Sequence, residues 1–448
     1  MDVLLVLVGW AAVLFVGVPL SIGLHEIGHL VPAKRFGIRC TQYMIGFGPT
    51  VWSRQVGETE YGVKVIPLGG YVRMIGMYPP RRDGAPARSA SSGRWAAMIE
   101  EARHQARADI RPEDADRQFY QRSVPQRVIV MMGGPLMNLL IATVVVGGVL
   151  TLYGVQQKST VIKSVSQCVL APTAPASATC TPSDRPAPAA AAGFRPGDRI
   201  LRLDGRPVSS WSQVQTEIRS HGGVALPITV SRGGQQVDLT LTPILDQREA
   251  LDPDGNPIRN PDGGVRTEKV GFAGLSPGYE NVRQPVSAVP GVVWGGVTQT
   301  AAILVTVPAK MVGVVKAILG LQERDPGSPV SLIGVGRVAG EVAAGEGAAA
   351  GASVGDRVIS LAGLLASLNL ALFVFNLVPL LPLDGGHVAG ALWEGLRRSA
   401  ARLLRRPDPG PVDTARALPL VYAGASLLLV MGGLLILADL VSPARIVG

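Results

Sequence analysis

The chain has 448 residues, of which 47% are hydrophobic and only 17% are charged. A charged fraction this far below the roughly 25% of ordinary soluble domains argues against a soluble globular protein. The net charge of +9 is compatible with a nucleic-acid partner, but the lysines and arginines cluster beside long uncharged runs, which argues against nucleic acid and for a lipid bilayer.

Four uncharged runs are each long enough to cross about 30 Å of hydrocarbon as a helix. These runs are residues 3–24, 128–153, 358–383 and 417–438. Short loops rich in lysine and arginine stay in the cytoplasm, which sets the orientation. We therefore expect the N-terminus outside, residues 34–127 inside, 154–355 outside, 395–416 inside and the C-terminus outside. A cleaved signal peptide is the alternative for the first run, and the acidic Asp2 disfavours it.

The first predicted transmembrane helix, residues 1–33, contains "HEIGH" at positions 25–29. His25 and His29 are four residues apart, so they share one face of a helix. Two imidazoles at this spacing can bind one Zn²⁺, and Glu26 beside the first can accept a proton from zinc-bound water. Such groups are costly within a membrane, which favours a functional site. The alternative is a pair of histidines hydrogen-bonded to neighbouring helices.

The predicted cytoplasmic segment, residues 34–127, has two parts. The alternating stretch "YGVKVIPLGGYVRMIGM" predicts a β-hairpin within residues 41–78, and its apolar character places the hairpin on or in the membrane surface. Residues 79–122 mix charges of both signs with proline, alanine and serine, which predicts a flexible insert with some helix. Cys40 falls on the reducing side of the membrane and is expected to be a free thiol.

The second predicted transmembrane helix, residues 128–154, leads into a compact outside α+β domain over residues 155–245. Its sequence predicts a strand at 199–203, a turn at Asp204 and Gly205, a helix, and two paired strands at 224–231 and 236–242. Cys168 and Cys180 lie in this outside region. A disulfide between them and two free thiols both remain open, because sequence alone fixes no pairing.

Residues 246–355 are expected to form an outside linker and helices on the membrane surface. Within them, residues 284–309 carry no charge but contain Pro285, Pro290 and Pro308, and we expect this run to lie on or partly in the outer membrane face. A crossing here would reverse the direction of the next transmembrane helix. The acidic residue at the end of that helix would then lie about a bilayer thickness from the histidines.

That acidic residue is Asp384, in "FNLVPLLPLDGGH" within the third predicted transmembrane segment, residues 356–396. Catalytic zinc usually has three protein ligands, so Asp384 is the candidate third ligand, with His387 as a second candidate. Two prolines break the helix here, and two glycines allow close backbone approach. The alternative is a juxtamembrane aspartate that faces solvent. A cytoplasmic loop at 397–416 and a fourth helix with its tail at 417–448 complete the chain.

Five motifs taken together resemble the site-2 protease family of zinc intramembrane proteases, in the bacterial branch that cleaves anti-sigma factors. They are "HEIGH", "GFGP" at 46–49, "IPLGGYVRMIGM" at 66–77, "GGPLMNLLIA" at 133–142 and "NLVPLLPLDGGH" at 376–387. The stretch "AAGFRPGDRILRLDGRPV" at 191–208 makes the outside domain look like a PDZ domain. A single PDZ domain, the cysteine pair and the C-terminal tail are most similar to actinobacterial members.

The resemblance implies that His25, His29 and Asp384 bind Zn²⁺ and that Glu26 is the general base. It implies substrate contact by Asn376, and the same role for Asn138 competes with an interhelical hydrogen bond. The fold expected is a polytopic α-helical membrane protein with about four transmembrane helices, a membrane-associated β-hairpin and one extracytoplasmic PDZ-like α+β domain. The expected location is the bacterial inner membrane, with the active site near the cytoplasmic side.

The implied activity is intramembrane cleavage of single-span proteins such as anti-sigma factors, after a first cut by another protease. The implied partners are these substrates, the lipid bilayer and a PDZ-bound substrate or regulator, with no nucleic acid. Two other functions compete. A membrane scaffold with an inert metal site is disfavoured by the intact motif, and an ion or metal transporter is disfavoured by the small number of spans without repeated halves.

Overall fold

The chain divides into two compact units, and the second is inserted between two sequence segments of the first. The computed structural model describes residues 16–77, 79, 110–169, 180–181, 184–252, 258, 260, 264–325, 327–344, 353–412 and 417–442. The first unit, here the helical unit, comprises Met1–Thr151 and Pro285–Gly448, and the second, here the sheet unit, is Leu152–Gln284.

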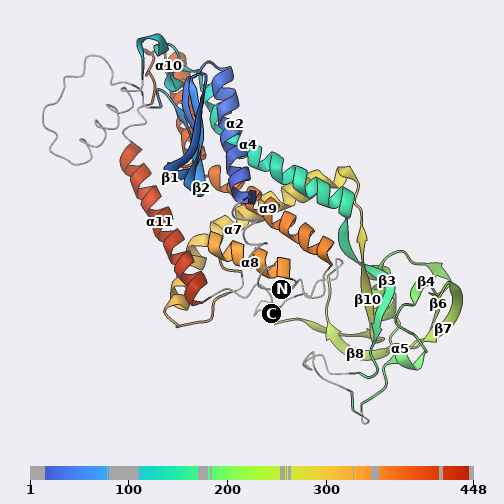
Figure 1. Ribbon diagram of the computed structural model, residues 1–448. Helices are drawn as coiled ribbons and strands as arrows, with labels where there is room; N and C mark the ends of the chain where they lie inside the picture. Colours follow the sequence, from blue (N-terminus) through green and yellow to red (C-terminus); the bar gives the residue numbers. More distant parts are fainter. Residues whose placement is uncertain are drawn as a thin grey trace. The chain divides into compact units, whose positions relative to one another are not determined.

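The helical unit contains long helices and one β-sheet (Figure 1). Its elements are α2 (Val18–Arg35), β1 (Cys40–Val56), β2 (Thr59–Met74), α4 (Val124–Gly148), α7 (Val289–Ile318), α8 (Leu332–Ala344), α9 (Val354–Asn376), α10 (Asp384–Leu403) and α11 (Leu418–Val441). A short π-helical turn, Val149–Tyr153, continues α4. Short 3₁₀ turns occur at Pro112–Asp114, Phe119–Gln121 and Val286–Ala288.

Four helices within the described residues are long and apolar enough to cross a membrane. They are Val124–Tyr153, Val286–Ile318, Val354–Asn376 and Leu418–Val441. Three of these coincide with the second, third and fourth predicted spans. The first predicted run, residues 3–24, lies mostly outside the described residues, and α2 includes its end. The third predicted segment, residues 356–396, is two helices, because residues 377–383 separate α9 from α10.

Helix α7 differs from the other apolar helices in where its two ends lie. At its start, Val289 lies against Gly147, near the end of α4. Near its other end, Val314 packs against Leu435, close to the end of α11. Both α4 and α11 are predicted to run outward, so both ends of α7 meet the ends of helices predicted to lie outside. Helix α7 is long and apolar enough to cross a membrane. These contacts nevertheless favour a position of residues 284–309 on the outer membrane face, and that position stays a prediction.

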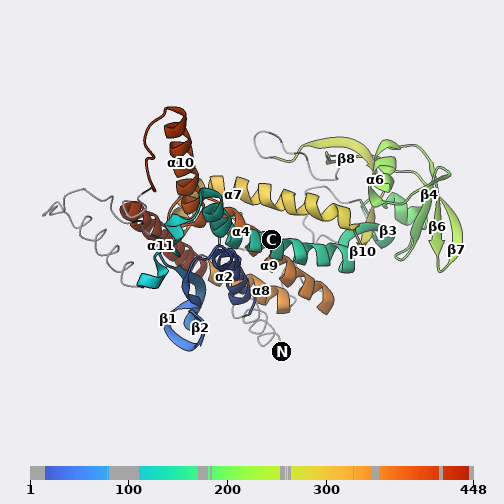
Figure 2. The same cartoon turned by 90° about the horizontal axis from the view of Figure 1, so that it is seen from above.

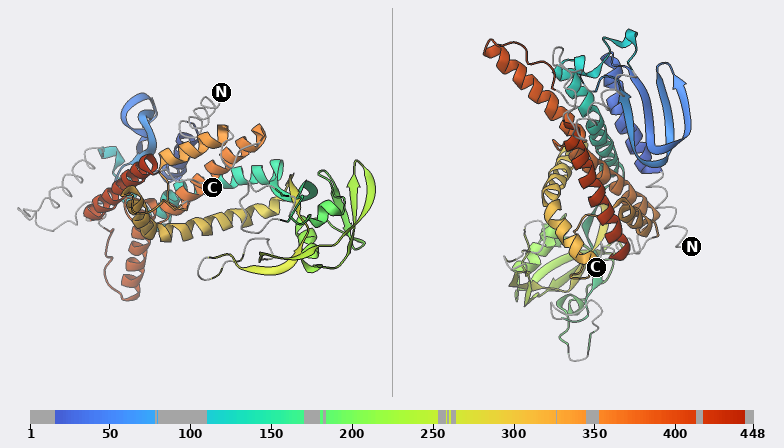
Figure 3. Two further views of the ribbon diagram at one scale, coloured as in Figure 1. Left: turned by 90° about the horizontal axis from the view of Figure 1, so that it is seen from below. Right: turned by 90° about the vertical axis from the view of Figure 1, so that its left-hand side faces the viewer.

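The predicted hairpin over residues 41–78 forms, and bends in both strands turn it into a sheet of four segments. Tyr43 pairs with Val72 on one side and with Tyr61 on the other, so the first half of β1 lies between the two halves of β2. Glycine is required at the first bend, because a Cβ at Gly46 would lie 2.5 Å from the carbonyl oxygen of Ile66. The sheet lies beside α2 (Figures 2 and 3).

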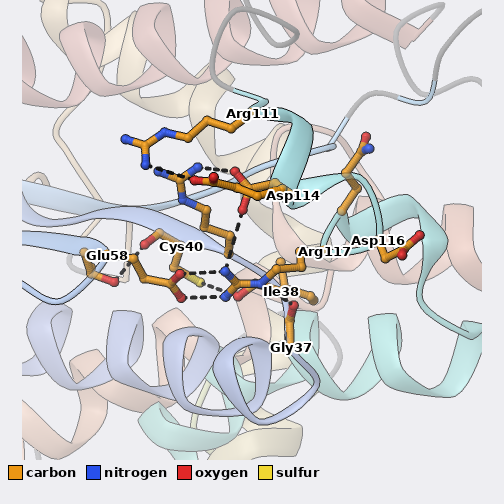
Figure 4. Close-up of polar contacts among 12 residues, drawn as sticks. Gly37, Ile38, Cys40, Glu58, Arg111, Asp114, Asp116 and Arg117 are labelled. Carbon is orange, nitrogen blue, oxygen red and sulfur yellow. Dashed lines mark hydrogen bonds and ion pairs between the residues drawn. The ribbon is translucent and has the colours of Figure 1, made fainter.

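Residues 110–122 hold the base of this sheet against the end of α2. Figure 4 shows Arg117 pointing toward Glu58, and its guanidinium donates two hydrogen bonds of 2.7 Å to that carboxylate. Hydrogen bonds from Arg117 hold the pKa of Glu58 below its usual range. Asp114 is buried and accepts a hydrogen bond from Arg39. The predicted flexible insert therefore does not extend over residues 110–122, while residues 80–109 lie outside the described residues.

Two other side chains make this junction a small core. Phe119 is buried in the cluster that includes Cys40, Met74 and residues of α2 and α4. Burial raises the pKa of the Cys40 thiol to about 12, so the thiol is protonated and unreactive at neutral pH. The backbone N–H of Phe119 donates to the carbonyl of Ile75, so this segment is fixed to the end of β2.

The sheet unit is an α+β domain. Its strands are β3 (Val155–Val165), β4 (Arg199–Leu203), β5 (Arg206–Pro207), β6 (Leu226–Arg232), β7 (Gln235–Leu241), β8 (Ile244–Glu249), β9 (Thr267–Phe272) and β10 (Leu275–Val282), and its helices are α5 (Pro188–Ala191) and α6 (Trp211–Ser220). The main sheet has the order β10-β3-β4-β6-β7, with β5 paired to β4, and β8 pairs with β9 in a separate arm. The predicted strand at 199–203, the following turn and helix, and the next two strands are confirmed.

The domain boundary predicted at residue 245 is wrong. Strand β10 pairs with β3, so the domain continues to Gln284, and the described part of residues 246–284 includes most of β8 and all of β9 and β10. This pairing joins segments more than 100 residues apart, which local sequence patterns do not reveal. Cys168 and Cys180 are joined by a disulfide, which resolves the alternatives left open by the sequence.

Candidate metal centre

Helix α2 carries three titratable side chains on its inner face. His25 and His29 are one helical turn apart, and Glu26 lies next to the first of them along the chain. His29 and Glu26 are buried, with 5% and 8% of their surfaces exposed. Buried groups of this kind are costly unless they have partners or bind a metal, so their partners decide what they do.

Asp384 reaches the two histidines from the break between α9 and α10. Pro379 and Pro382 lie in this break, where proline cannot continue a helix. Glycine is needed just after the aspartate, because a Cβ at Gly385 would lie 2.4 Å from the carbonyl oxygen of Val378. The broken helix therefore folds back on itself and holds Asp384 as the first residue of α10.

The three predicted ligands converge with the spacing of a tetrahedral metal site. The Nε2 atoms of His25 and His29 are 3.2 Å apart, and they lie 3.5 Å and 3.4 Å from Oδ2 of Asp384. Zinc bonded at about 2.0–2.1 Å with tetrahedral angles separates neighbouring ligand atoms by about 3.4 Å. These residues therefore fit a zinc ion. Among the described residues, they form the group of histidine and carboxylate side chains that could hold a metal ion.

The second ring nitrogens of both histidines contact helix α4. Nδ1 of His29 lies 2.8 Å from the carbonyl oxygen of Val130, and Nδ1 of His25 lies 3.0 Å from the side-chain amide of Asn138. A hydrogen bond at the second nitrogen fixes the tautomer and the ring orientation of a metal-bound histidine. Asn138 is 0% exposed, and its contact with α2 favours the interhelical hydrogen bond that the sequence left open over a contact with substrate.

Three glycines that the sequence reasoning did not assign to the site bring α2 and α4 together. A Cβ at Gly28 would lie 2.2 Å from the carbonyl oxygen of Gly133, and one at Gly133 would lie 1.9 Å from the carbonyl oxygen of Gly28. A Cβ at Gly134 would lie 2.2 Å from Nε2 of His29. The signal was present in the sequence, since small residues in membrane helices often mark close helix packing.

The site opens into a pocket of about 300 Å³ that is bounded on one side by β2. Glu26, Asp384 and the two histidines line it, together with Gly70, Tyr71, Val72 and Met74 of β2 and with Met77, Met131, Pro382 and His387. Residues 70–74 pair with the first half of β1, and no described strand pairs with their other edge. An unpaired strand edge therefore lies beside the candidate general base.

The remaining two sequence candidates lie further from the metal ligands. His387 lines the same pocket but does not belong to the group of potential metal ligands, so Asp384 is the better third ligand. Asn376 is half-buried at the end of α9 and is not among the described residues that line the pocket. Its predicted substrate contact stays a prediction.

Comparison with known proteins places this arrangement in a family. The sequence model described as "Peptidase family M50" matches residues 13–404. The zinc metalloprotease Rip1 of Mycobacterium tuberculosis is 33% identical over 443 residues, which cover 95% of this chain and 96% of the relative. Rip1 of Mycolicibacterium smegmatis is 31% identical, covering 98% and 99%. The metalloprotease MmpA of Caulobacter vibrioides is 30% identical, covering 84% of each chain.

Proposed function

The chain belongs to peptidase family M50, the zinc-dependent site-2 proteases, and from that premise we propose that it cleaves peptide bonds within transmembrane segments of single-span proteins such as anti-sigma factors. The observation that carries the proposal is the convergence of His25, His29 and Asp384 at tetrahedral spacing beside Glu26. Relatives from two mycobacteria agree with the predicted resemblance to actinobacterial members.

His25, His29 and Asp384 would hold the zinc ion, which when bound acidifies a water molecule and polarises the scissile carbonyl. The carboxylate of Glu26 faces the same pocket and accepts the proton of the attacking water. Glu26 then delivers this proton to the amine nitrogen that leaves as the peptide bond breaks. Burial of Glu26 and His29 keeps competing bulk water away from this proton transfer.

The edge of β2 is the proposed binding surface for the substrate backbone. A helical substrate must unwind locally, because its peptide bonds are otherwise closed within the helix. Residues 70–74 line the pocket with an edge that no described strand occupies, so an unwound segment can add to the sheet by backbone hydrogen bonds. In this proposal the scissile bond lies between the strand edge and Glu26, which line the same pocket.

The sheet unit is proposed to act as a PDZ-like filter outside the cell membrane. A groove of about 870 Å³ runs along α6 and β10, with the end of β9 and the short β9–β10 connection, residues 271–274, among its lining. Lys158 and Lys163 line it too, against one acidic residue, Glu249, so it suits a peptide with an acidic or carboxylate end. Exclusion of substrates with intact outside domains would make cleavage depend on a first cut by another protease.

The proposed location is the bacterial inner membrane, with the active site toward the cytoplasm. Lysines and arginines support this orientation, since Lys34 and Arg35 end α2 and five arginines lie between residues 397 and 406. The metal ligands lie close to both groups along the chain. The partners are then the bilayer and single-span membrane proteins, and no nucleic acid is involved.

The test compares wild type with Glu26→Gln in liposomes that contain a single-span substrate with a truncated outside domain. Glu26→Gln removes the base but keeps the three ligands, so zinc content should equal that of wild type while cleavage within the span is lost. Glu113→Gln is the matched control, because Glu113 is an exposed carboxylate in the cytoplasmic segment. Equal cleavage by wild type and Glu26→Gln would contradict the assignment, and absence of zinc from wild type would overturn the metal site.

A further inference from the structure

The contact between Asn138 and His25 joins two groups whose hydrogen-bonding roles can be assigned. Nε2 of His25 faces Nε2 of His29 and Oδ2 of Asp384, so it is the metal-facing atom. A neutral imidazole that uses Nε2 as a ligand carries its proton on Nδ1. Nδ1 of His25 must therefore donate a hydrogen bond, and Asn138 is the side chain within reach at 3.0 Å.

The amide of Asn138 is placed with its NH₂ toward this donor, and its carbonyl oxygen is buried without a partner among the described residues. An unpaired buried carbonyl is costly, and two donors facing each other are unfavourable. Rotation of the amide by a half turn exchanges oxygen and nitrogen, which have almost the same shape. The rotated amide places Oδ1 against the N–H of His25, so the oxygen gains a donor and the two donors no longer face each other.

We propose that Asn138 is a positioning residue for the metal centre, whose Oδ1 accepts a hydrogen bond from Nδ1–H of His25 and fixes that ring for zinc. This inference rests on the proposed function, because it takes His25 as a ligand. It replaces the substrate contact predicted from the sequence, which a side chain with 0% exposure cannot make.

The arrangement makes α4 the element that orients both histidines of α2. For His29 the acceptor is the backbone carbonyl of Val130, which no substitution of that side chain removes. For His25 the acceptor is a side chain, so a substitution at Asn138 can test the orientation of one ligand without touching the other. Loss of such a partner typically lowers metal affinity about 10–100-fold.

The experiment measures zinc affinity of the full-length protein in detergent by competition with a chelator, and the absorption spectrum of bound Co²⁺. Asn138→Leu removes the acceptor and should weaken zinc binding about 10–100-fold while altering the Co²⁺ spectrum. Asn138→Asp keeps an acceptor but offers no donor, so it should bind zinc at least as tightly as wild type. Retained affinity in this variant also excludes general damage from substitution at this position.

Asn369→Leu is the matched control. Asn369 is another fully buried asparagine that hydrogen-bonds to α2, through Ser21 at 3.0 Å, and it does not touch the metal ligands. Its affinity for zinc should stay within about twofold of wild type. If Asn138→Leu keeps the zinc affinity and the Co²⁺ spectrum of wild type, the inference is overturned while the proposed function stands. The same holds if Asn138→Asp binds zinc as weakly as Asn138→Leu, because the amide would then act as a donor. A wild-type protein without zinc would overturn the proposed function and the inference together.

Discussion

Substitution of Gly134 by alanine should disable the metal centre by steric displacement. The added Cβ would lie 2.2 Å from Nε2 of His29 and 2.7 Å from Nε2 of His25. Non-bonded heavy atoms pack at about 3.5 Å, so His29 must move by about 1 Å. Ligand distances in a competent metal site vary by only about 0.2 Å. We therefore expect zinc affinity to fall by at least about 100-fold, which corresponds to about 2.7 kcal/mol.

The assay is zinc competition with a chelator on full-length protein that elutes as a single species in detergent. Gly148→Ala is the control, because Gly148 ends the same helix and a Cβ there meets nothing within 4 Å. This control should bind zinc like wild type. A Gly134→Ala protein whose zinc affinity stays within about threefold of wild type would refute the reasoning that a side chain at this position displaces the metal-binding histidines.

Three further outcomes are expected. Gly70→Ala should lower kcat in proteoliposome cleavage assays, because its Cβ would lie 2.9 Å from the backbone oxygen of Met44 and 3.0 Å from Cγ of Glu26, so the candidate general base must shift. Burial tends to raise the pKa of Asp198, but hydrogen bonds from Arg232 and from backbone outweigh it and lower the pKa. The stabilisation by this pair is therefore fully present above about pH 4, the pKa of an aspartate in the unfolded chain, and is lost as the pH falls through the lowered pKa of the folded state. Hydrogen exchange of the sheet unit should show this pH dependence, and the dependence should be weaker in Asp198→Asn. Glu394→Gln should destabilise the helical unit by about 3–5 kcal/mol in denaturant titrations, because it leaves Arg127 buried without its carboxylate. The double variant Arg127→Met, Glu394→Leu should recover most of the lost stability, because it removes both buried charges.

The three candidate metal ligands could be predicted from sequence because their chemistry is encoded locally. The spacing of His25 and His29 fixes their common helix face before any tertiary contact forms. Asp384 could be found because the prolines before it interrupt an apolar run, and orientation from the arginines placed it on the same side of the membrane as the histidines. The apolar helices and the alternating strands could be predicted for the same reason, since each is a pattern among residues close together in sequence.

Long-range pairing was not visible in the same way. The closure of the outside domain by β10 and the four-segment sheet of β1 and β2 depend on which distant strands meet, and a strand pattern does not name its partner. The domain boundary predicted at residue 245 missed the pairing of β10 with β3 for this reason. The described end of the predicted insert 79–122, residues 110–122, likewise contacts α2 and β2, which local patterns do not reveal.

The sequence by itself determined the class of protein, the metal-binding residue types and their order along the chain. It did so because hydropathy, charge asymmetry and helical spacing act through residues near one another in sequence. Only the tertiary structure decided that α2 and α4 approach each other closely at Gly28, Gly133 and Gly134. It also placed the amide of Asn138 beside His25, in the interhelical contact that the sequence left open as an alternative to substrate binding, because the direction of a side chain is set by the packing of helices and not by its own sequence position.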